Sequence, residues 1–546
     1  MGVKRNILRP VAWLAGQHAA RQLRAFMAAH ERTERVQDEL LRAMVGRHAE
    51  TAFGRDHGFA SIRGYEDFRR AVPVGSYETH RPYVERVLAG ETEALVPRGE
   101  RVLMFSLTSG TTGAPKHVPV TRRFLADMRK GWNIAGLMAL RDHPEGWLRA
   151  ILQIASPMCE ERSPTGLPCG AISGLLAATQ KRIVRRMYPV PQAVQAISDP
   201  TAKYYAILRC AVDKDVALIT TANPSSTIRL IETGQAHAER LIRDVADGRL
   251  GPPGEVPPEL AASLKFRPNR ALARRMEDGM RRDGVLLPRH FWKPAILMNW
   301  TGGTLKLYLR RLRELFGDVP VRDIGLLASE GRFSVPLADD TPAGVAEITA
   351  NFLEFMPVED HDATNPRTLR AHELEVGAEY FLVVSNWAGL WRYNMDDRVR
   401  VTGRLGRSPV FEFLSRGTRT ANITGEKITE HQVVEAMRQA CAAGVHIEQF
   451  VMQGRFAGTP YYELRIEETA GCDLSRVAAL MDETLAGLNM EYRSKRHSGR
   501  LGPIRAVALQ AGTLKKAEAD KVRARWGRSE QYKHQYLLTE VLQDEP

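Results

Sequence analysis

Apolar residues in the N-terminal three quarters of the chain follow two spacings. Val36, Leu40, Leu41, Met44 and Val45 recur at helical spacing and predict the core face of an amphipathic helix. Short continuous apolar runs predict buried strands, and helical stretches separate them. These runs cover residues 102–105, 117–120, 148–155, 217–221, 294–300 and 321–328. The alternation predicts an α/β fold with a large N-terminal α/β domain, in which helices flank several sheets.

The pattern changes near residue 415. Thr429 is expected to cap a helix, and a strand-strand-helix-strand order follows it. The ranges expected for these four elements are 449–453, 461–466, 475–488 and 504–509. A chain of 546 residues is too long for one core, whereas a module of about 130 residues can fold on its own. We therefore predict two domains, residues 1–414 and residues 415–546, of which the second is a smaller, mobile α+β domain, with a hinge at Arg416.

The segment after the first strand of this pattern carries unusual chemistry. It reads Thr108-Ser109-Gly110-Thr111-Thr112-Gly113-Ala114-Pro115-Lys116. Glycine leaves backbone N–H groups uncovered, and hydroxyl and ammonium groups donate hydrogen bonds, so the composition suits a polyphosphate. It is not a Walker A loop, because no Gly-Lys-Ser/Thr opens a helix after it. A polar hairpin turn with an incidental lysine is the competing interpretation.

Two glycine-containing turns follow further along the chain. Trp300-Thr301-Gly302-Gly303 lies between an apolar strand and an amphipathic helix, where glycine either lets a flat ligand approach the backbone or simply forms the turn. Ser329-Glu330 ends an apolar strand, at the position where α/β folds bind ligands. The Glu330 carboxylate either binds Mg²⁺ beside a phosphate or lies exposed in a capping turn.

An acidic turn comes next, at Asp396-Asp397. Val399 and Val401 alternate with polar residues and predict a strand that leaves this turn. An ionised carboxylate at the turn accepts hydrogen bonds from both hydroxyls of a ribose. The competing interpretation is a surface pair of aspartate and arginine with little energetic value.

Together, in this order, the four motifs resemble those of the adenylate-forming enzymes, the superfamily of acyl-CoA synthetases, peptide-synthetase adenylation domains and luciferases. Within it the chain resembles the Gretchen-Hagen-three family of acyl acid amido synthetases, and its arginine-rich composition suggests a bacterial-type member. The resemblance runs from about Phe53 to Tyr536. The local contexts that carry it are residues 105–116, 299–303, 316–321, 352–355, 391–393, 411–413, 425–430 and 531–533.

The resemblance implies a role for each motif residue. By this resemblance, Lys116 is a catalytic residue at the phosphates. Lys427 or Lys533 is the lysine of the C-terminal domain that reaches the reacting carboxylate. Glu330 is the Mg²⁺ ligand. The implied ATP-binding residues are Ser109, Gly110, Thr111, Thr112, Gly113, Gly302, Gly303, Ser329, Asp397 and Arg416. The family usually has glycine before the ribose-binding aspartate, and this chain has Asp396 there, so either aspartate remains a candidate.

The acyl pocket is expected on the helix after the phosphate loop. Arg123, Met128 and Trp132 are the candidates. Residues at such helical spacing serve equally well as plain core, and that interpretation is favoured for Met128.

Composition and charge bear on the partners, the metal sites and the cellular location that we expect. The formal net charge of +13 comes from arginine-rich helical segments without a nucleic-acid-binding motif, so we expect no nucleic-acid partner and a general attraction for anionic substrates. The five cysteines form no CxxC pair, so the spacing predicts reduced thiols rather than zinc or disulfides. No apolar run reaches transmembrane or signal-peptide length, and we expect a cytoplasmic protein with no membrane partner.

The expected function is ATP-dependent activation of a carboxylic acid as an acyl-adenylate, with release of pyrophosphate. Transfer to an amino acid or amine then forms an amide and releases AMP. ATP and Mg²⁺ are the expected cofactors, and the resemblance suggests a monomer. An acyl-CoA ligase that makes a thioester from the same adenylate is the alternative, and a non-catalytic nucleotide-binding protein on this fold is the alternative of another class.

Overall fold

The structure, a computed structural model, describes residues 9–108, 116–303, 305, 308–417, 420–421, 423–424, 426, 428–442, 447, 449–456, 459–467, 473–497, 501–524 and 534–543. The chain divides into two compact units. Unit 1 consists of Met1–Thr301, Arg311–Met395 and Val399–Phe413, and unit 2 of Gly302–Arg310, Asp396–Arg398 and Leu414–Pro546. Two short internal segments thus group with the C-terminal residues.

Helices form the N-terminal part of unit 1, as the spacing of apolar residues predicts. Leu41, Met44 and Val45 of α3 are at most 3% exposed, so the predicted face is the buried face. The helices of this part are α2 (Arg9–Ala29), α3 (Thr33–His48), α4 (Ala52–Asp56), α5 (Tyr65–Ala71) and α6 (Tyr77–Leu88).

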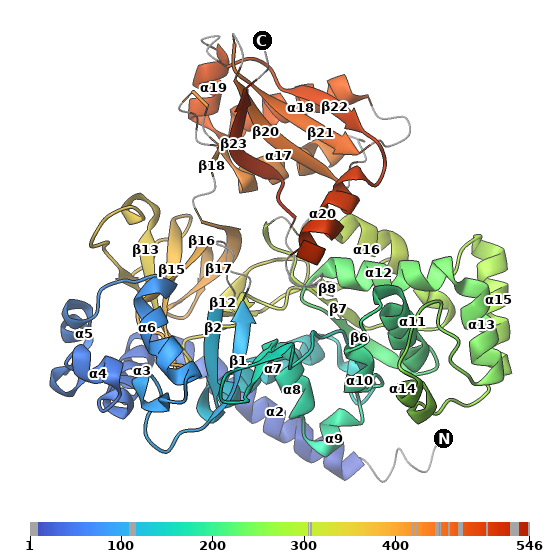
Figure 1. Ribbon diagram of the computed structural model, residues 1–546, viewed down its shortest axis with the longest axis horizontal. Coiled ribbons are helices and arrows are strands. Elements are labelled where there is room, and N and C mark those ends of the chain that lie inside the picture. The colour runs from blue at the N-terminus through green and yellow to red at the C-terminus, as the bar shows by residue number, and fades with distance from the viewer. Residues whose placement is uncertain are drawn as a thin grey trace. The chain divides into compact units, whose positions relative to one another are not determined.

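A four-stranded parallel sheet has the strand order β3-β6-β7-β8. Its strands are β3 (Ala150–Gln153), β6 (Val216–Thr220), β7 (Ile296–Met298) and β8 (Val321–Arg322). Parallel strands require crossover connections, which explains the alternation of apolar runs and helices in this part of the sequence. The helices around it include α11 (Pro200–Ala211), α12 (Pro224–Ala236), α13 (Ala238–Asp247) and α15 (Arg270–Asp283), seen beside the sheet in Figure 1.

A second, mixed sheet has the order β2-β1-β5-β4. Its strands are β1 (Val102–Thr108), β2 (Lys116–Thr121), β4 (Glu161–Arg162) and β5 (Pro168–Gly170). Strands β1 and β2 are antiparallel, and their last rung pairs Thr108 with Lys116. Thr121 ends β2 and caps α7 (Arg122–Asp142) by accepting a 3.2 Å hydrogen bond from Phe124 N.

The largest sheet has seven strands in the order β11-β12-β17-β16-β15-β13-β14. They are β11 (Ser334–Pro336), β12 (Gly344–Ala346), β13 (Phe352–Pro357), β14 (Leu369–Arg370), β15 (Glu379–Ser385), β16 (Tyr393–Leu405) and β17 (Ser408–Arg416). Trp391, which is fully buried, precedes β16 and packs edge-on against Phe59 and Phe68. This aromatic cluster joins the N-terminal helices to the sheet.

A buried ion pair lies under the aromatic cluster. Arg392 Nη2 lies 2.9 Å from Glu354 Oε1, and both side chains are at most 2% exposed. Arg392 also donates to the carbonyls of Arg69 and Val72, so the guanidinium ties β13 to the end of α5. Its φ of 42° is in the left-handed region, a strained conformation that these contacts hold in place.

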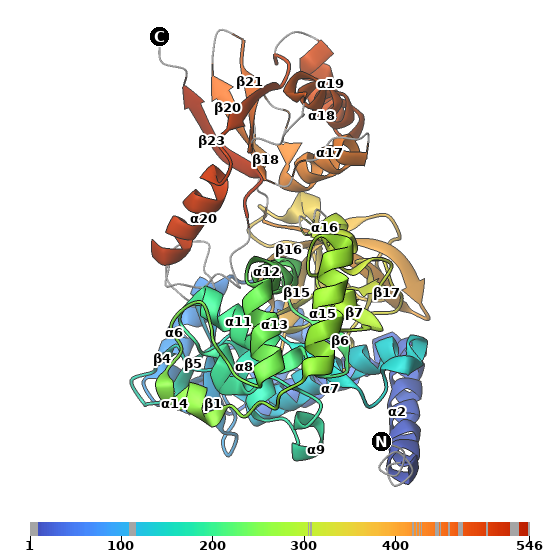
Figure 2. The ribbon, with the colours of Figure 1, turned by 90° about the vertical axis from the view of Figure 1, so that its right-hand side faces the viewer.

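Unit 2 contains a four-stranded sheet in the order β22-β21-β20-β23. Its strands are β20 (Phe450–Phe456), β21 (Tyr461–Glu467), β22 (Arg505–Leu509) and β23 (Leu537–Gln543). The helices α17 (Glu430–Ala442) and α18 (Leu474–Leu488) pack on one face of it, as Figure 2 shows. Thr429 caps α17 through a 3.2 Å hydrogen bond from Gln432 N, as expected. The sequence prediction missed α19 (Met490–His497), α20 (Thr513–Ala524) and β23.

Removing the charge of Glu354 tests the importance of the buried ion pair. Glu354→Gln leaves the Arg392 guanidinium buried without its counter-ion, and we expect the free energy of unfolding to fall by about 3 kcal/mol. Urea unfolding followed by tryptophan fluorescence measures the loss. Glu39→Gln, which removes the exposed partner of Arg35, is the matched control and should leave the midpoint unchanged. Equal stability of both variants would contradict this role of the pair.

Candidate functional site

The predicted phosphate loop begins and ends on paired strands. Thr108 is the last described residue of β1, and it pairs with Lys116, the first residue of β2. The predicted loop residues Ser109, Gly110, Thr111, Thr112 and Gly113 lie outside the described residues, as do Lys427 and Lys533. Their roles therefore stay predictions, while the structure defines the two ends of the loop.

Lys116 lies beside an aromatic ring. Its Nζ is 5.5 Å from the centroid of Tyr77, a cation–π distance. The Tyr77 hydroxyl accepts a 2.9 Å hydrogen bond from His117 N and donates one of 3.1 Å to His117 O. Burial raises the pKa of Tyr77, so the phenol stays protonated and able to donate. Tyr77 thus holds the start of β2 and, with it, the backbone of Lys116.

Ser329 and Glu330 lie in a turn next to the other end of the loop. They connect two short antiparallel strands, β9 (Leu327–Ala328) and β10 (Gly331–Arg332). Ser329 Oγ donates a 3.4 Å hydrogen bond to the carbonyl of Leu107 in β1. Glu330 is 2% exposed, and Asn386 Nδ2 donates to its carbonyl at 2.7 Å. The exposed capping turn considered from the sequence is therefore wrong, because the glutamate is buried near the carboxyl end of β1.

An aspartate that the sequence analysis missed holds the turn before Gly302 and Gly303. Asp323 Oδ2 accepts hydrogen bonds from Thr301 N and Oγ1 at 2.6 and 2.8 Å, and Oδ1 accepts one from Gly325 N at 2.6 Å. Burial raises the pKa of Asp323 to about 6. Its position after the strand at Val321 was a usable signal, since carboxylates at the ends of parallel strands commonly organise turns there. Gly303 has a φ of 56°, which favours glycine.

The predicted acidic turn is wrong, because Asp396 and Asp397 lie inside β16 and the strand begins before them, at Tyr393. One of the two aspartates is paired and the other is strained. Asp397 is 4% exposed, and Arg416 Nε lies 3.1 Å from its Oδ1. Asp396 has a φ of 58°, and its carbonyl accepts a 2.6 Å hydrogen bond from Gly417 N. Aspartate tolerates this left-handed conformation better than most residues, so Asp396 can occupy a position where the resemblance leads one to expect glycine.

The three acyl-pocket candidates lie in different surroundings along α7. Arg123 pairs with Asp127 at 3.1 Å on the surface, and Met128 is 3% exposed in the hydrophobic core, as the core interpretation expects. The half-buried indole of Trp132 lies 4.6 Å from the guanidinium of Arg332, one residue beyond Gly331.

Arg332 is a second group that the sequence analysis missed. It is 1% exposed and donates to the carbonyl of Ile324 at 2.5 Å, and burial lowers its pKa to about 10. A Cβ on Gly131 of α7 would lie 2.5 Å from its Cδ, so glycine at position 131 lets the helix approach. Arg332 thus places the half-buried Trp132 next to the segment that carries Glu330, which comes two residues before Arg332 in the chain.

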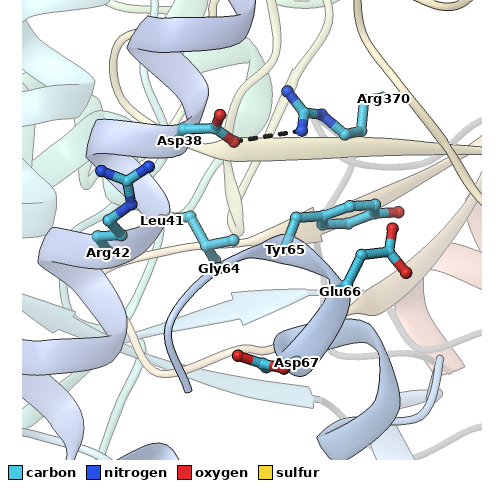
Figure 3. A pocket seen from close by; sticks show the side chains of 8 residues that line it. All are labelled: Asp38, Leu41, Arg42, Gly64, Tyr65, Glu66, Asp67 and Arg370. Atoms are coloured by element: carbon cyan, nitrogen blue, oxygen red, sulfur yellow. Dashed lines mark ion pairs between the residues drawn. The ribbon is translucent and has the colours of Figure 1, made fainter.

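A separate cavity of about 260 Å³ lies between α3 and α5. Figure 3 shows the ion pair of Asp38 and Arg370 at its rim, with Tyr65 and Glu66 beside it. None of the predicted site residues lines this cavity. Its mixed charges are typical of a solvated surface recess, and it is not part of the candidate site.

Three family models cover most of the chain. Residues 22–321 match the GH3 family N-terminal domain, residues 345–416 the GH3 family central domain, and residues 431–541 the GH3 family C-terminal domain. The chain belongs to the GH3 family. This confirms the resemblance to the Gretchen-Hagen-three family that the ordered motifs indicate.

Individual GH3 proteins are similar to the chain over most of its length. A protein named probable indole-3-acetic acid-amido synthetase GH3.2, from Oryza sativa subsp. japonica, is 24% identical over 527 residues, which cover 88% of this chain and 84% of that protein. A solved structure named GH3.15 acyl acid amido synthetase has a TM-score of 0.81 at 21% identity and covers 95% of this chain and 94% of its own.

A more distant solved structure shares the fold outside the family. A 2-hydroxyisobutyryl-CoA ligase in the postadenylation state has a TM-score of 0.51 at 14% identity, with 92% of this chain and 89% of its own covered. The predicted fold class, the α/β fold of adenylate-forming enzymes, is therefore confirmed. Within the described part of this GH3 family member, no helix combines the length and the apolar character that a bilayer crossing requires.

The left-handed conformation of Asp396 can be tested by substitution. In Asp396→Gly the strand loses a side chain but gains a residue that adopts this φ freely, whereas in Asp396→Ala the same φ costs roughly 1 kcal/mol or more. We expect the glycine variant to match the wild type in urea unfolding and the alanine variant to unfold at lower urea. An alanine variant as stable as the glycine variant would show that the backbone at position 396 is not left-handed.

Proposed function

We propose that the chain is an ATP-dependent acyl acid amido synthetase that joins a small carboxylic acid to an amino acid or amine. The observation that carries this proposal is the match to all three GH3 family domains in order. It is supported by the burial of Glu330 beside the carboxyl end of β1, where the glycine- and hydroxyl-rich loop begins. The names of the similar proteins, an amido synthetase and an acyl acid amido synthetase, agree with it.

The reaction has two steps. In the first, an oxygen of the substrate carboxylate attacks the α-phosphorus of ATP. The bond between the α-phosphorus and the oxygen that bridges it to the β-phosphorus breaks, and pyrophosphate leaves. In the second, the amine nitrogen attacks the carbonyl carbon of the acyl-adenylate, AMP leaves, and the nitrogen loses a proton to give the amide. The protein contributes chiefly by positioning the reactants and neutralising charge.

Each motif residue has a proposed task in the first step. Residues 109–113 donate hydrogen bonds to the phosphates, and the Lys116 ammonium offsets their charge. The carboxylate of Asp397 accepts hydrogen bonds from the ribose hydroxyls. The ion pair of Asp397 with Arg416 supports this choice over Asp396, because it holds the Asp397 carboxylate in one orientation.

The proposed tasks of the remaining residues follow the family pattern. Gly302 and Gly303 lie against the adenine, and Ser329 lies by the α-phosphate. Lys427 or Lys533 from the C-terminal residues stabilises the charge that develops on the carboxylate during adenylation, and Arg416 marks the hinge about which the C-terminal domain moves before the amine enters. Of the acyl-pocket candidates, Trp132 has the strongest support, because it contacts Arg332, which follows Glu330 closely in the chain.

Glu330 is the proposed ligand of Mg²⁺. A single carboxylate fits this ion, because Mg²⁺ in nucleotide sites is commonly held by one or two carboxylates together with phosphate oxygens and water. When bound, Mg²⁺ neutralises charge on the phosphates. We propose that the protein is a cytoplasmic monomer that acts on small molecules and not on nucleic acid.

Exchange of labelled pyrophosphate into ATP tests the first step. We expect exchange that depends on an added carboxylic acid, measured over a broad panel of aliphatic and aromatic acids. Lys116→Ala should lower kcat/KM for exchange by about 10²- to 10³-fold, because charge neutralisation at the phosphates is lost. Lys214→Ala is the matched control, since Lys214 pairs with Asp213 on the surface, and it should exchange like the wild type.

The outcomes separate the proposed function from its alternatives. Folded protein that binds ATP but exchanges with no acid is a non-catalytic nucleotide-binding protein, which contradicts the proposal. Exchange followed by a thioester when CoA is added, with no amide from any amino acid, identifies an acyl-CoA ligase. Wild-type exchange by Lys116→Ala would show that Lys116 has no role in the adenylation step.

A further inference from the structure

Three potential metal ligands meet on one face of the sheet that carries Lys116. In the register of this sheet, His117 of β2 pairs with Leu107 of β1, Phe105 of β1 pairs with Cys169 of β5, and Cys169 pairs with Glu161 of β4. Paired residues share a face of a sheet, and so do residues two apart on one strand. The side chains of His117, Cys169 and Glu161 therefore point to the same side, across the central strand β1.

The donor atoms of these three residues lie close together. One nitrogen of His117, the sulfur of Cys169 and one carboxylate oxygen of Glu161 are all within 4.8 Å of one another. His117 Nε2 and Glu161 Oε1 are 3.4 Å apart, and their side chains are 21% and 31% exposed. Cys169 is 1% exposed and packs in the hydrophobic core. The cluster is thus open to solvent on the side of His117 and Glu161 and closed by the core on the side of the thiol.

The combination of donors selects one class of cation. Imidazole nitrogen, thiolate sulfur and carboxylate oxygen are the ligands that Zn²⁺ takes in proteins, and three protein ligands leave a fourth position for water. Mg²⁺ and Ca²⁺ prefer oxygen ligands alone and do not suit a thiolate. The spacing of cysteines along the sequence predicts no zinc site. It does not reveal this cluster, because the three ligands come from three strands and meet only through the register of the sheet.

We propose that His117, Glu161 and Cys169 form a binding site for one Zn²⁺ ion. On binding, the Cys169 thiol releases its proton to solvent and a zinc–sulfur bond forms, without any change of oxidation state. The bound ion would link β2, β5 and β4, one residue from Lys116 and from the rung that closes the phosphate loop. This inference does not depend on the proposed function, because it concerns binding alone.

Cobalt substitution tests the site in the full-length protein. After treatment with a chelator, the protein is titrated with Co²⁺, whose bond to a thiolate gives a charge-transfer absorption band. We expect one Co²⁺ per chain with this band, displacement by one equivalent of Zn²⁺, and no displacement by excess Mg²⁺. Cys169→Ser should abolish the band and weaken Zn²⁺ binding by more than the roughly 10- to 100-fold that loss of an outer-shell partner costs.

Two further variants keep the test independent of folding. Glu161→Gln alters a partly exposed side chain, and we expect it to keep the band while binding Zn²⁺ more weakly, as measured by competition with a chromogenic chelator. Cys441→Ser, a change in unit 2 far along the chain, should behave like the wild type. The absence of a thiolate band in the wild type, or a band and affinity that are unchanged in Cys169→Ser, would overturn the proposal.

Discussion

The register of β1 and β2 is the constraint on which the rest of the site depends. Pairing Thr108 with Lys116 fixes both ends of the loop, and Tyr77 holds β2 through both backbone groups of His117. The turn of Ser329 then packs at the carbonyl of Leu107. The sheet and the residues packed on it thus set the positions of the two ends of the predicted loop.

Buried charge shapes the segments that carry the acidic residues. The ion pair of Arg392 and Glu354 secures the chain just before β16, the strand that contains Asp397. Asp396 is strained, and Asp397 is paired with Arg416. Strained backbone and buried carboxylates lower the free energy of unfolding, and they persist only where surrounding contacts determine the conformation. Their concentration in this one segment agrees with the proposed task of Asp397 in holding ribose.

Local signals in the sequence predicted much of the fold and only part of the site. Thr429 caps α17 because a cap needs only a hydroxyl and the next few backbone groups, and the parallel strands of unit 1 form continuous apolar runs. The strand β23 was missed because it pairs in parallel with β20, far away in the sequence. Asp323 meets Thr301 through tertiary packing, and Arg332 meets Trp132 in the same way. The cluster of His117, Glu161 and Cys169 likewise forms only when the strands pair. The strain at Asp396 is likewise a property of the folded backbone.

A crystal structure of the protein with AMP and Mg²⁺ tests the central claim most directly, namely that the ordered motifs bind a single nucleotide. We expect ribose hydroxyls within hydrogen-bonding distance of the Asp397 carboxylate and a phosphate next to Ser329 and residues 109–113. A nucleotide bound elsewhere, or one that contacts Asp397 but none of the loop and turn residues, would contradict it.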